Sequence, residues 1–278
     1  MAALRETDSS KRDRLKELYY QIKDCKLCDL HKTRINFVFG SGNSNAPIIF
    51  VGEAPGRNED LQGKPFVGQA GRLLDELLLF IGFNRNDVFI ANVLKCRPPE
   101  NRDPGVTEIN TCKNYLFRQI EIINPIIICT MGRYSTQLVL DTSANISKLR
   151  GKIFKIGQSI VLPINHPAAA LYTPSKLQVL REDFKKIKDI FDNYENPGAV
   201  GEITVISGLK KMDKSKTDKT RAGEARAGEA TAGNARTDEA RAGEAKADKY
   251  RMDEEVQVSE NEYDERAAKD KNQQLGLF

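Results

Sequence analysis

Short apolar runs that end in turn residues recur along the first two thirds of the chain. The first run leads into the turn GEAPG, and the third reads IIICT before a Met-Gly pair. Continuous apolar runs of this length are typical of strands in a parallel sheet that is covered on both faces. The runs that predict such strands occupy residues 48–51, 88–96, 125–132 and 160–167.

Apolar residues at helical spacing lie before and between these runs. Leu15, Leu18 and Ile22 fall on one side of a predicted amphipathic helix over residues 11–23. Strands that alternate with helices predict an α/β fold, a three-layer α/β/α sandwich around a central, mostly parallel sheet. In such a fold the site lies at the carboxyl ends of the strands. Further helices are predicted over residues 70–81, 107–123, 133–140 and 177–194.

The composition changes abruptly after residue 196. Five-residue units such as RAGEA and TAGNA repeat from residue 221 onward, and they contain no large apolar side chain. A period of five matches neither a helix nor a strand. We therefore expect a catalytic domain over residues 1–196 and a disordered, low-complexity tail over residues 197–278.

Charge and composition narrow the class of protein only modestly. The first 196 residues carry 28 Lys and Arg against 22 Asp and Glu, and the tail carries 15 against 17. A mildly basic body is compatible with a nucleic-acid partner, although many enzymes without one have the same balance. The N-terminus is charged and no apolar run approaches 18 residues, so we expect a soluble, cytoplasmic protein with no membrane partner.

Five cysteines in a chain without an export signal indicate thiols or metal ligands rather than disulfides. Cys25 and Cys28 form a C-x-x-C pair, and Cys96 and Cys112 follow from a second segment. Four thiolates can hold zinc or a [4Fe–4S] cluster, and their spacing leaves zinc, cluster and no metal all open. Cys129 lies inside an apolar run and is expected to be a small core residue.

Polar motifs follow the predicted strands, at the edge where a doubly wound sheet gathers its site. Glu53 and Ala54 lie in the first turn, Glu59 and Asp60 come shortly after it, and Asn92 ends the second run. The motif GKPFVG at residues 63–68, the loop RPPENR at residues 97–102 and the motif HPAA at residues 166–169 complete the set. Because parallel strands end at one edge, these motifs can meet in one cleft.

Each motif also has a plain structural interpretation. The GEAPG turn can bind a phosphate, although it lacks the glycine spacing and Lys-Ser/Thr of a Walker A loop. Phe66 can be a core aromatic, Asn92 a strand-end cap and His166 a structural histidine. No single motif decides between these interpretations.

Taken together, the motifs closely resemble family 4 uracil-DNA glycosylases. The matching segments are CxLC, GEAPG with Glu59 and Asp60, GxPFVGxAG, NVxKCRPPxNR and HPAA, and they span about residues 15–191. The resemblance implies an enzyme that hydrolyses the N-glycosidic bond of a flipped-out uracil in DNA. It would leave an abasic site and so initiate base-excision repair. It also implies a [4Fe–4S] cluster, held by Cys25, Cys28, Cys96 and Cys112.

The same resemblance assigns the recognition of the base. Phe66 would stack on the flipped uracil. The Asn92 amide would donate to O4 and accept from N3–H, a pattern that cytosine presents in reverse. The segment from GEAPG to Glu59 would exclude the thymine methyl group.

The resemblance also assigns the chemistry. His166 and the backbone N–H near Ala54 would stabilise the uracil anion at O2. Glu53 would orient the water or counter the positive sugar, and Glu59 would line the pocket and hold a polar network with Asn101. We see no lysine suited to form a Schiff base with the sugar, so we expect a monofunctional glycosylase without strand cleavage.

Two further segments suggest contacts outside the pocket. After HPAA, Leu171 would wedge into the base stack and Lys176 would meet a phosphate, although a plain loop fits equally well. The chain ends in QLGLF, residues 274–278, which resembles the peptide that docks bacterial repair proteins on the sliding clamp. The residues that would dock are Gln274, Leu275, Leu277 and Phe278. An inert terminus is the alternative.

Two rival functions are compatible with the same residues. One is a glycosylase of broader range that also removes hypoxanthine and other deaminated bases. The other is a non-catalytic iron–sulfur module that binds DNA, which would not need Glu53, Asn92 and His166. In each case we expect a monomer.

Overall fold

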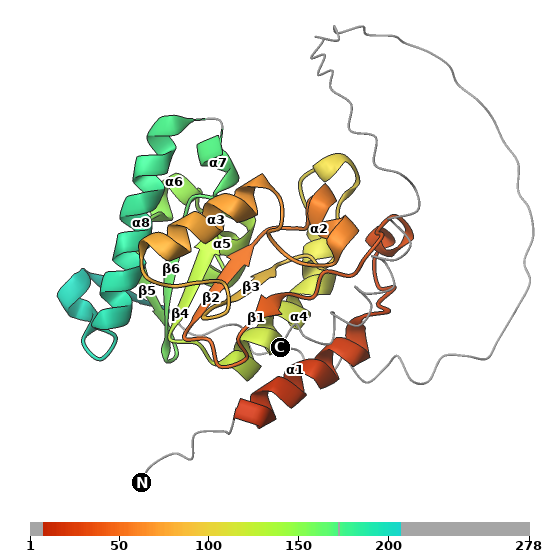
Figure 1. Cartoon of the computed structure of the whole chain (residues 1–278), viewed down its shortest axis with the longest axis horizontal. Helices are drawn as coiled ribbons and strands as arrows, with labels where there is room; N and C mark the ends of the chain where they lie inside the picture. The colour runs from red at the N-terminus through yellow and green to blue at the C-terminus, as the bar shows by residue number, and fades with distance from the viewer. Residues whose placement is uncertain (1–7, 172, 207–278) are drawn as a thin grey trace, which may run out of the picture. The chain divides into compact units, whose positions relative to one another are not determined.

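The computed structural model describes residues 8–171 and 173–206 (Figure 1). Its helices are α1 (Asp8–Ile22), α2 (Arg57–Gln62), α3 (Gln69–Phe80), α4 (Val106–Ile123), α5 (Arg133–Leu140), α6 (Ile146–Leu149), α7 (Ala168–Leu171) and α8 (Pro174–Asp192), with 3-10 turns η1 (Asp29–Lys32), η2 (Pro99–Asn101) and η3 (Pro197–Val200). Its strands are β1 (Ser41–Gly42), β2 (Ile48–Gly52), β3 (Phe89–Asn92), β4 (Ile127–Met131), β5 (Ile153–Ile156), β6 (Ser159–Ile164) and β7 (Ile203–Ile206).

The strands form one sheet in the spatial order β1-β3-β2-β4-β6-β5-β7. The central strands β3, β2, β4 and β6 are all parallel, and they contain the four apolar runs of the sequence. Toward the edges, β1 and β5 join antiparallel, and β7 runs parallel to β5. The predicted α/β fold with a mostly parallel sheet is therefore confirmed.

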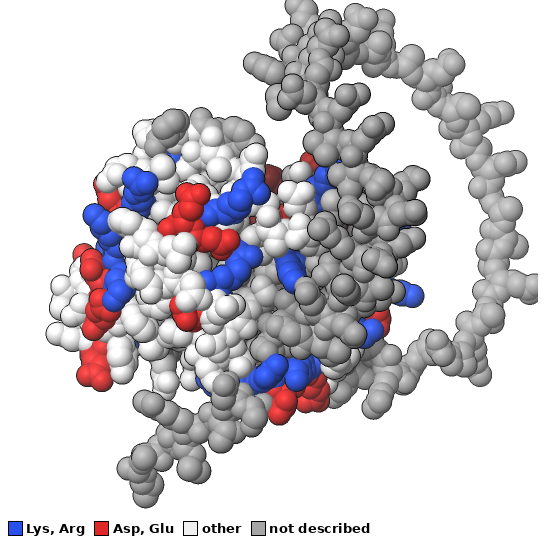
Figure 2. Space-filling view, viewed as in Figure 1, with Lys and Arg blue, Asp and Glu red and all other residues white. Residues whose placement is uncertain are grey.

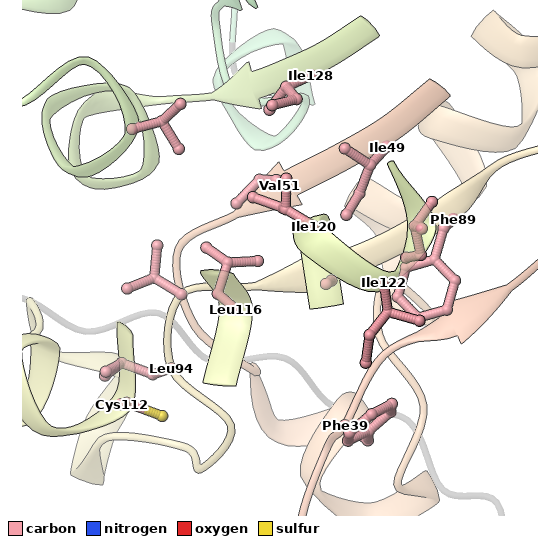
Figure 3. Close-up of a cluster of buried hydrophobic side chains, with 14 of the residues drawn as sticks. Phe39, Ile49, Val51, Phe89, Leu94, Cys112, Leu116, Ile120, Ile122 and Ile128 are labelled. Carbon is pink, nitrogen blue, oxygen red and sulfur yellow. The ribbon is translucent and has the colours of Figure 1, made fainter. Parts of the chain in front are cut away.

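Alternate residues of the central strands enter two separate cores. Ile49 and Val51 of β2 belong to the core shared with α1, α4 and α5, whereas Ile48 and Phe50 belong to the core shared with α3 and α8. Figure 3 shows the first core, where side chains of β2, β3 and α4 converge. Burying each large apolar side chain contributes about 1.5–3 kcal/mol. Two such cores hold the helices on both faces and leave the strand ends free to form a site.

Residues 197–206 belong to this fold, so the domain boundary predicted after residue 196 is wrong by at least these ten residues. The strand β7 pairs with β5 from Ile203 opposite Ile153 to Ile206 opposite Ile156. Its Val205 is 76% exposed, so β7 lacks the two-sided burial that produces a continuous apolar run. Residues 207–278, with the predicted clamp peptide, lie outside the described residues.

The surface carries charges of both signs. Figure 2 shows Lys and Arg side chains interspersed with Asp and Glu over the part of this face that is not grey, in keeping with a formal net charge of +4. No helix within residues 8–171 and 173–206 is both long enough and apolar enough to cross a membrane.

Helix α8 is fastened to the turn before β5 by a buried ion pair. Arg150 Nε lies 2.9 Å from Asp183 Oδ2, and Arg150 also donates to the carbonyl of Val179 at 3.2 Å. The Asp183 side chain is only 4% exposed. Burial raises the pKa of this carboxyl, and the Arg150 guanidinium opposes that rise.

Arg150→Met is expected to lower the free energy of unfolding by about 3–5 kcal/mol at neutral pH, because it leaves a buried carboxylate without its cation. Burial raises the folded-state pKa of Asp183 above its unfolded value, so the folded state takes up this proton more readily. The loss should therefore shrink as the pH falls below that raised pKa. Urea unfolding at pH 5 and pH 8 measures it, with Arg150→Met/Asp183→Leu as the control that recovers stability. An equal loss at both pH values would contradict this account.

Candidate active site

A cavity of about 360 Å³ opens at the carboxyl ends of β2, β3 and β6. Residues 53–56, which line it, directly follow β2; Asn92 ends β3, and His166 and Ala168 come shortly after β6. This edge of the sheet is where the sequence predicts the site. All seven residues expected to act on the base or in catalysis line the cavity, namely Glu53, Ala54, Glu59, Phe66, Asn92, Asn101 and His166.

The Asn92 side chain is an unpartnered amide in this cavity wall. It is 2% exposed, and neither Nδ2 nor Oδ1 has a hydrogen-bond partner within the described part of the chain. Buried polar atoms almost always have a partner, because desolvating an amide without one costs about 1–3 kcal/mol. The amide can therefore donate one hydrogen bond and accept another from a ligand in the cavity.

Phe66 forms an aromatic wall, in a backbone conformation that side chains rarely adopt. Its φ is +54°, and its ring stacks on His166 with centroids 5.4 Å apart. Arg85 donates to the carbonyl of Phe66 and also pairs with Asp75 at 3.0 Å. A Cβ added at Gly71 would lie 1.8 Å from the same carbonyl oxygen. The strained Phe66 is thus held by an ion pair and by the close approach of a glycine.

Gly52 makes room for both the amide and the ring. It is the last residue of β2 and pairs with Asn92 across the sheet. A Cβ added at Gly52 would lie 2.4 Å from Asn92 Oδ1 and 2.7 Å from the Phe66 ring. The two side chains can meet over this position only because it has no side chain.

His166 is neutral in this environment. Burial lowers its pKa to about 4, although the charge of Glu59 acts in the opposite direction. The backbone N–H of Ala168 donates to Nδ1 at 3.2 Å, so Nδ1 acts as the acceptor of the neutral ring. From that hydrogen bond we assign the proton to Nε2. His166 can therefore donate one hydrogen bond from Nε2.

Glu53 titrates close to neutral pH. Burial, and after it the charge of Asp103, raise its pKa to about 7, while Arg133 opposes the rise. Its carboxyl forms no hydrogen bond with the described residues. A carboxyl of this kind can serve as a base or as a counter-charge above its pKa.

The carboxylate of Glu59 accepts hydrogen bonds from backbone groups on both sides of α2. It accepts from the backbone N–H groups of Gly56 at 3.1 Å, and of Val67 and Gly68 at 2.9 Å each. The Asn101 side chain instead accepts from Arg97 Nε at 2.8 Å. No hydrogen bond joins Glu59 to Asn101 among the described residues, and the network between them stays a prediction.

The four expected ligand cysteines lie in one neighbourhood. All are free thiols that influence one another electrostatically, with Cys96 and Cys112 buried and Cys25 and Cys28 partly exposed. Burial raises the pKa of Cys112 to about 12, and nearby Lys95 opposes the rise. Within the described residues, no three His, Cys, Asp or Glu side chains form a group able to hold a metal ion.

Two polar side chains already contact these thiols. Arg34 Nη1 donates to Cys96 Sγ at 3.1 Å, and the Tyr115 hydroxyl donates to Cys25 Sγ at 3.3 Å. Donors of this kind stabilise the thiolate form, which is the form that binds metals. The donor set therefore fits a thiolate-bound group. Cys129 is fully buried in β4, as predicted for a core residue.

The two residues expected to contact DNA do not line the cavity. Leu171 is 39% exposed at the end of α7, whose first residue, Ala168, lines the cavity. Lys176 is exposed in the first turn of α8. The expected clamp-binding residues lie outside the described chain.

Several residues that shape the site have no role in the sequence-based prediction. Gly52 and Gly71 lie in the motifs GEAPG and GxPFVGxAG, but they act through missing side chains, which the motifs do not reveal. Arg85 acts on a backbone carbonyl and lies outside the motifs. Lys95 and Gln119 form a buried polar pair beside Asn92. A lysine inside the apolar segment NVLKC is a signal that could have identified the pair.

Known proteins resemble this chain over the described domain. A family model described as the uracil DNA glycosylase superfamily matches residues 39–191. The type-4 uracil-DNA glycosylase of Archaeoglobus fulgidus is 48% identical over 184 residues, covering 63% of this chain and 92% of that protein. That of Saccharolobus solfataricus is 49% identical over 186 residues, covering 64% and 86%. That of Thermotoga maritima is 43% identical over 182 residues, covering 64% and 95%.

Gly52→Ala is expected to displace both Asn92 and Phe66, because the new Cβ overlaps the two side chains. Overpacking of this kind lowers the free energy of unfolding by about 1–3 kcal/mol. A crystal structure of the variant and its urea unfolding curve measure the two effects. Gly198→Ala is the control, since a Cβ there meets nothing closer than 3.9 Å. Unmoved side chains in Gly52→Ala would contradict the role given to Gly52.

Proposed function

Because the chain belongs to the type-4 uracil-DNA glycosylases of the uracil DNA glycosylase superfamily, we propose that it removes uracil from DNA. The reaction is hydrolysis of the N-glycosidic bond of a flipped-out nucleotide. It leaves an abasic site, and so it initiates base-excision repair.

The unpartnered amide of Asn92 is the observation that carries this proposal. Its Nδ2 can donate to uracil O4, and its Oδ1 can accept from N3–H. Cytosine offers a donor and an acceptor in the opposite order and would leave both pairs unmatched. A buried site that hydrogen-bonds its substrate in this way can discriminate by about 10⁴-fold.

The departing base is the group that needs stabilisation. When the bond between sugar and base breaks, the base takes the electron pair and becomes an anion with charge on O2. The Nε2–H of neutral His166 and the backbone N–H of Ala54 are the donors we assign to that oxygen. Phe66 supplies the surface on which the extruded base stacks.

A different residue, Glu53, acts on the sugar and the attacking water. We assign Glu53 in its carboxylate form to orient the attacking water or to counter the developing positive charge of the sugar. Glu59 holds the backbone of Gly56, Val67 and Gly68, so we assign it a positioning role.

The reaction we propose is monofunctional. No lysine lines the cavity within the described residues, and so no amine there can attack the sugar. The amine of Lys95, on the segment after β3, is occupied by Asn92 and Gln119.

We assign a [4Fe–4S] cluster to Cys25, Cys28, Cys96 and Cys112. The four thiols act on one another electrostatically, and Arg34 and Tyr115 already donate to two of them, which supports a thiolate-bound group here. Membership of the type-4 family favours a cluster over a zinc ion. Its contribution would be structural, since it would tie the segment before η1 to α4.

Contacts beyond the cavity complete the proposal. We assign Leu171 to fill the stack behind the extruded base, and Lys176 to contact a phosphate. Docking of the pentapeptide at residues 274–278 on a bacterial sliding clamp stays a prediction, as does the monomeric state.

Incubation with a labelled oligonucleotide that contains one uracil opposite guanine, followed by alkali, tests the function. We expect cleavage at uracil and not at thymine, with strand breakage only after alkali. Asn92→Ala should lower the single-turnover rate at least about 100-fold. Hypoxanthine presents its N1–H and O6 in the same order as uracil, so its cleavage would indicate the broader glycosylase. No cleavage at all by cluster-loaded protein would indicate the non-catalytic module.

The pH dependence tests the role of Glu53. If its carboxylate acts, kcat/KM should rise with pH to a plateau above an apparent pKa of about 7. His166, with a pKa of about 4, stays neutral throughout this range. Asp103→Asn should move the midpoint to lower pH, because the Asp103 charge raises the pKa of Glu53. A midpoint that persists in Glu53→Gln would contradict the assignment.

A further inference from the structure

A lysine is completely buried behind the cavity. Lys95 is 0% exposed, and its Nζ donates to the carbonyl of Asn92 at 2.8 Å and to Gln119 Oε1 at 2.7 Å. Gln119 of α4 is also 0% exposed, and it donates to the carbonyl of Phe39 at 3.0 Å. Lysine is almost never fully buried without a charged partner. Here its hydrogen-bond partners are a carbonyl and an amide, and the groups close enough to act on its charge are the sulfurs of Cys96 and Cys112. Burying an amine costs free energy of desolvation, and we therefore expect this lysine to perform a function.

The position of the amine indicates what it holds. It bonds the carbonyl of Asn92, whose side-chain amide has no partner of its own within the described residues. The direction of that amide therefore depends on the peptide group of Asn92 and on packing against Gly52. The chain just after it is fastened as well, since Val93 N–H donates to the Gly52 carbonyl at 3.1 Å and Leu94 N–H to the Glu53 carbonyl at 3.0 Å.

We propose that Lys95, held by Gln119, is a positioning residue that fixes the backbone of Asn92 and thereby aims its amide at the uracil. The proposal rests on the role given to Asn92 in the proposed function. Lys95 does not touch the base. It acts through Asn92, and Gln119 links this arrangement to α4, on the opposite side of the sheet from α3.

A double-mutant cycle on the full-length, cluster-loaded protein tests this role. Lys95→Met removes the donor and keeps much of the side-chain volume. We expect it to lower single-turnover kcat/KM on uracil by about 10–100-fold in wild-type background, and by less than about twofold in an Asn92→Ala background. Enzyme in excess keeps the slow variants measurable. Iron content and the melting temperature are recorded for each variant.

The control removes a comparable bond elsewhere. Lys11 Nζ donates to the carbonyl of Ile123 at 2.8 Å, at the far end of α4. Lys11→Met should leave the rate on uracil unchanged. Where Lys95→Met does not fold, Gln119→Leu and Gln119→Glu replace it. The Glu variant retains an acceptor for Lys95 and should keep the uracil rate, whereas the Leu variant should lose it.

The outcomes separate this proposal from the proposed function. An equal fold-loss for Lys95→Met in both backgrounds would show a general structural role and overturn the proposal. Equal losses for the two Gln119 variants would overturn it as well. If wild-type protein fails to cleave uracil, the proposed function itself fails. If wild type cleaves, Asn92→Ala does not and Lys95→Met keeps full rate, only the positioning role is lost.

Discussion

The parallel register of β2 and β3 is the constraint on which the site depends. It places Gly52 directly opposite Asn92 at the last paired position, so a missing side chain on one strand faces a polar one on the next. The ring of Phe66 then closes over the same point. A slip of one residue would turn Asn92 to the other face of the sheet. The two apolar cores that fix this register are therefore as necessary to the site as the residues that line it.

Burial shifts the pKa values of two groups in the cavity wall, His166 and Glu53, in opposite directions. It disfavours the charged form of each, so the pKa of His166 falls to about 4 while that of Glu53 rises to about 7. One low-dielectric environment thus yields a neutral donor and a carboxyl that ionises near neutral pH. The shared environment alone is sufficient to give these two groups different protonation behaviour.

The sequence predicts those structural features that depend only on the residue types within one segment of the chain. Runs such as IIFVG identify strands because both faces of those strands are buried, and Cys129 is placed in the core for the same reason. Interactions with backbone atoms are different, since any residue type can supply them. The carboxylate of Glu59 accepts from the backbone N–H groups of Val67 and Gly68, which no side-chain pattern reveals. The strand β7 was missed because none of its residues is fully buried, so it has no continuous apolar run.

The conformation of Phe66 has a consequence for how the protein responds to its solution. The strained ring is held partly through Arg85, whose other partner is the half-exposed Asp75. Ion pairs at such positions are weakened by dissolved salt. Added salt therefore weakens one of the contacts that hold Phe66, because it screens the ion pair between Arg85 and Asp75 of α3. This effect is separate from the effect of salt on contacts with DNA phosphates.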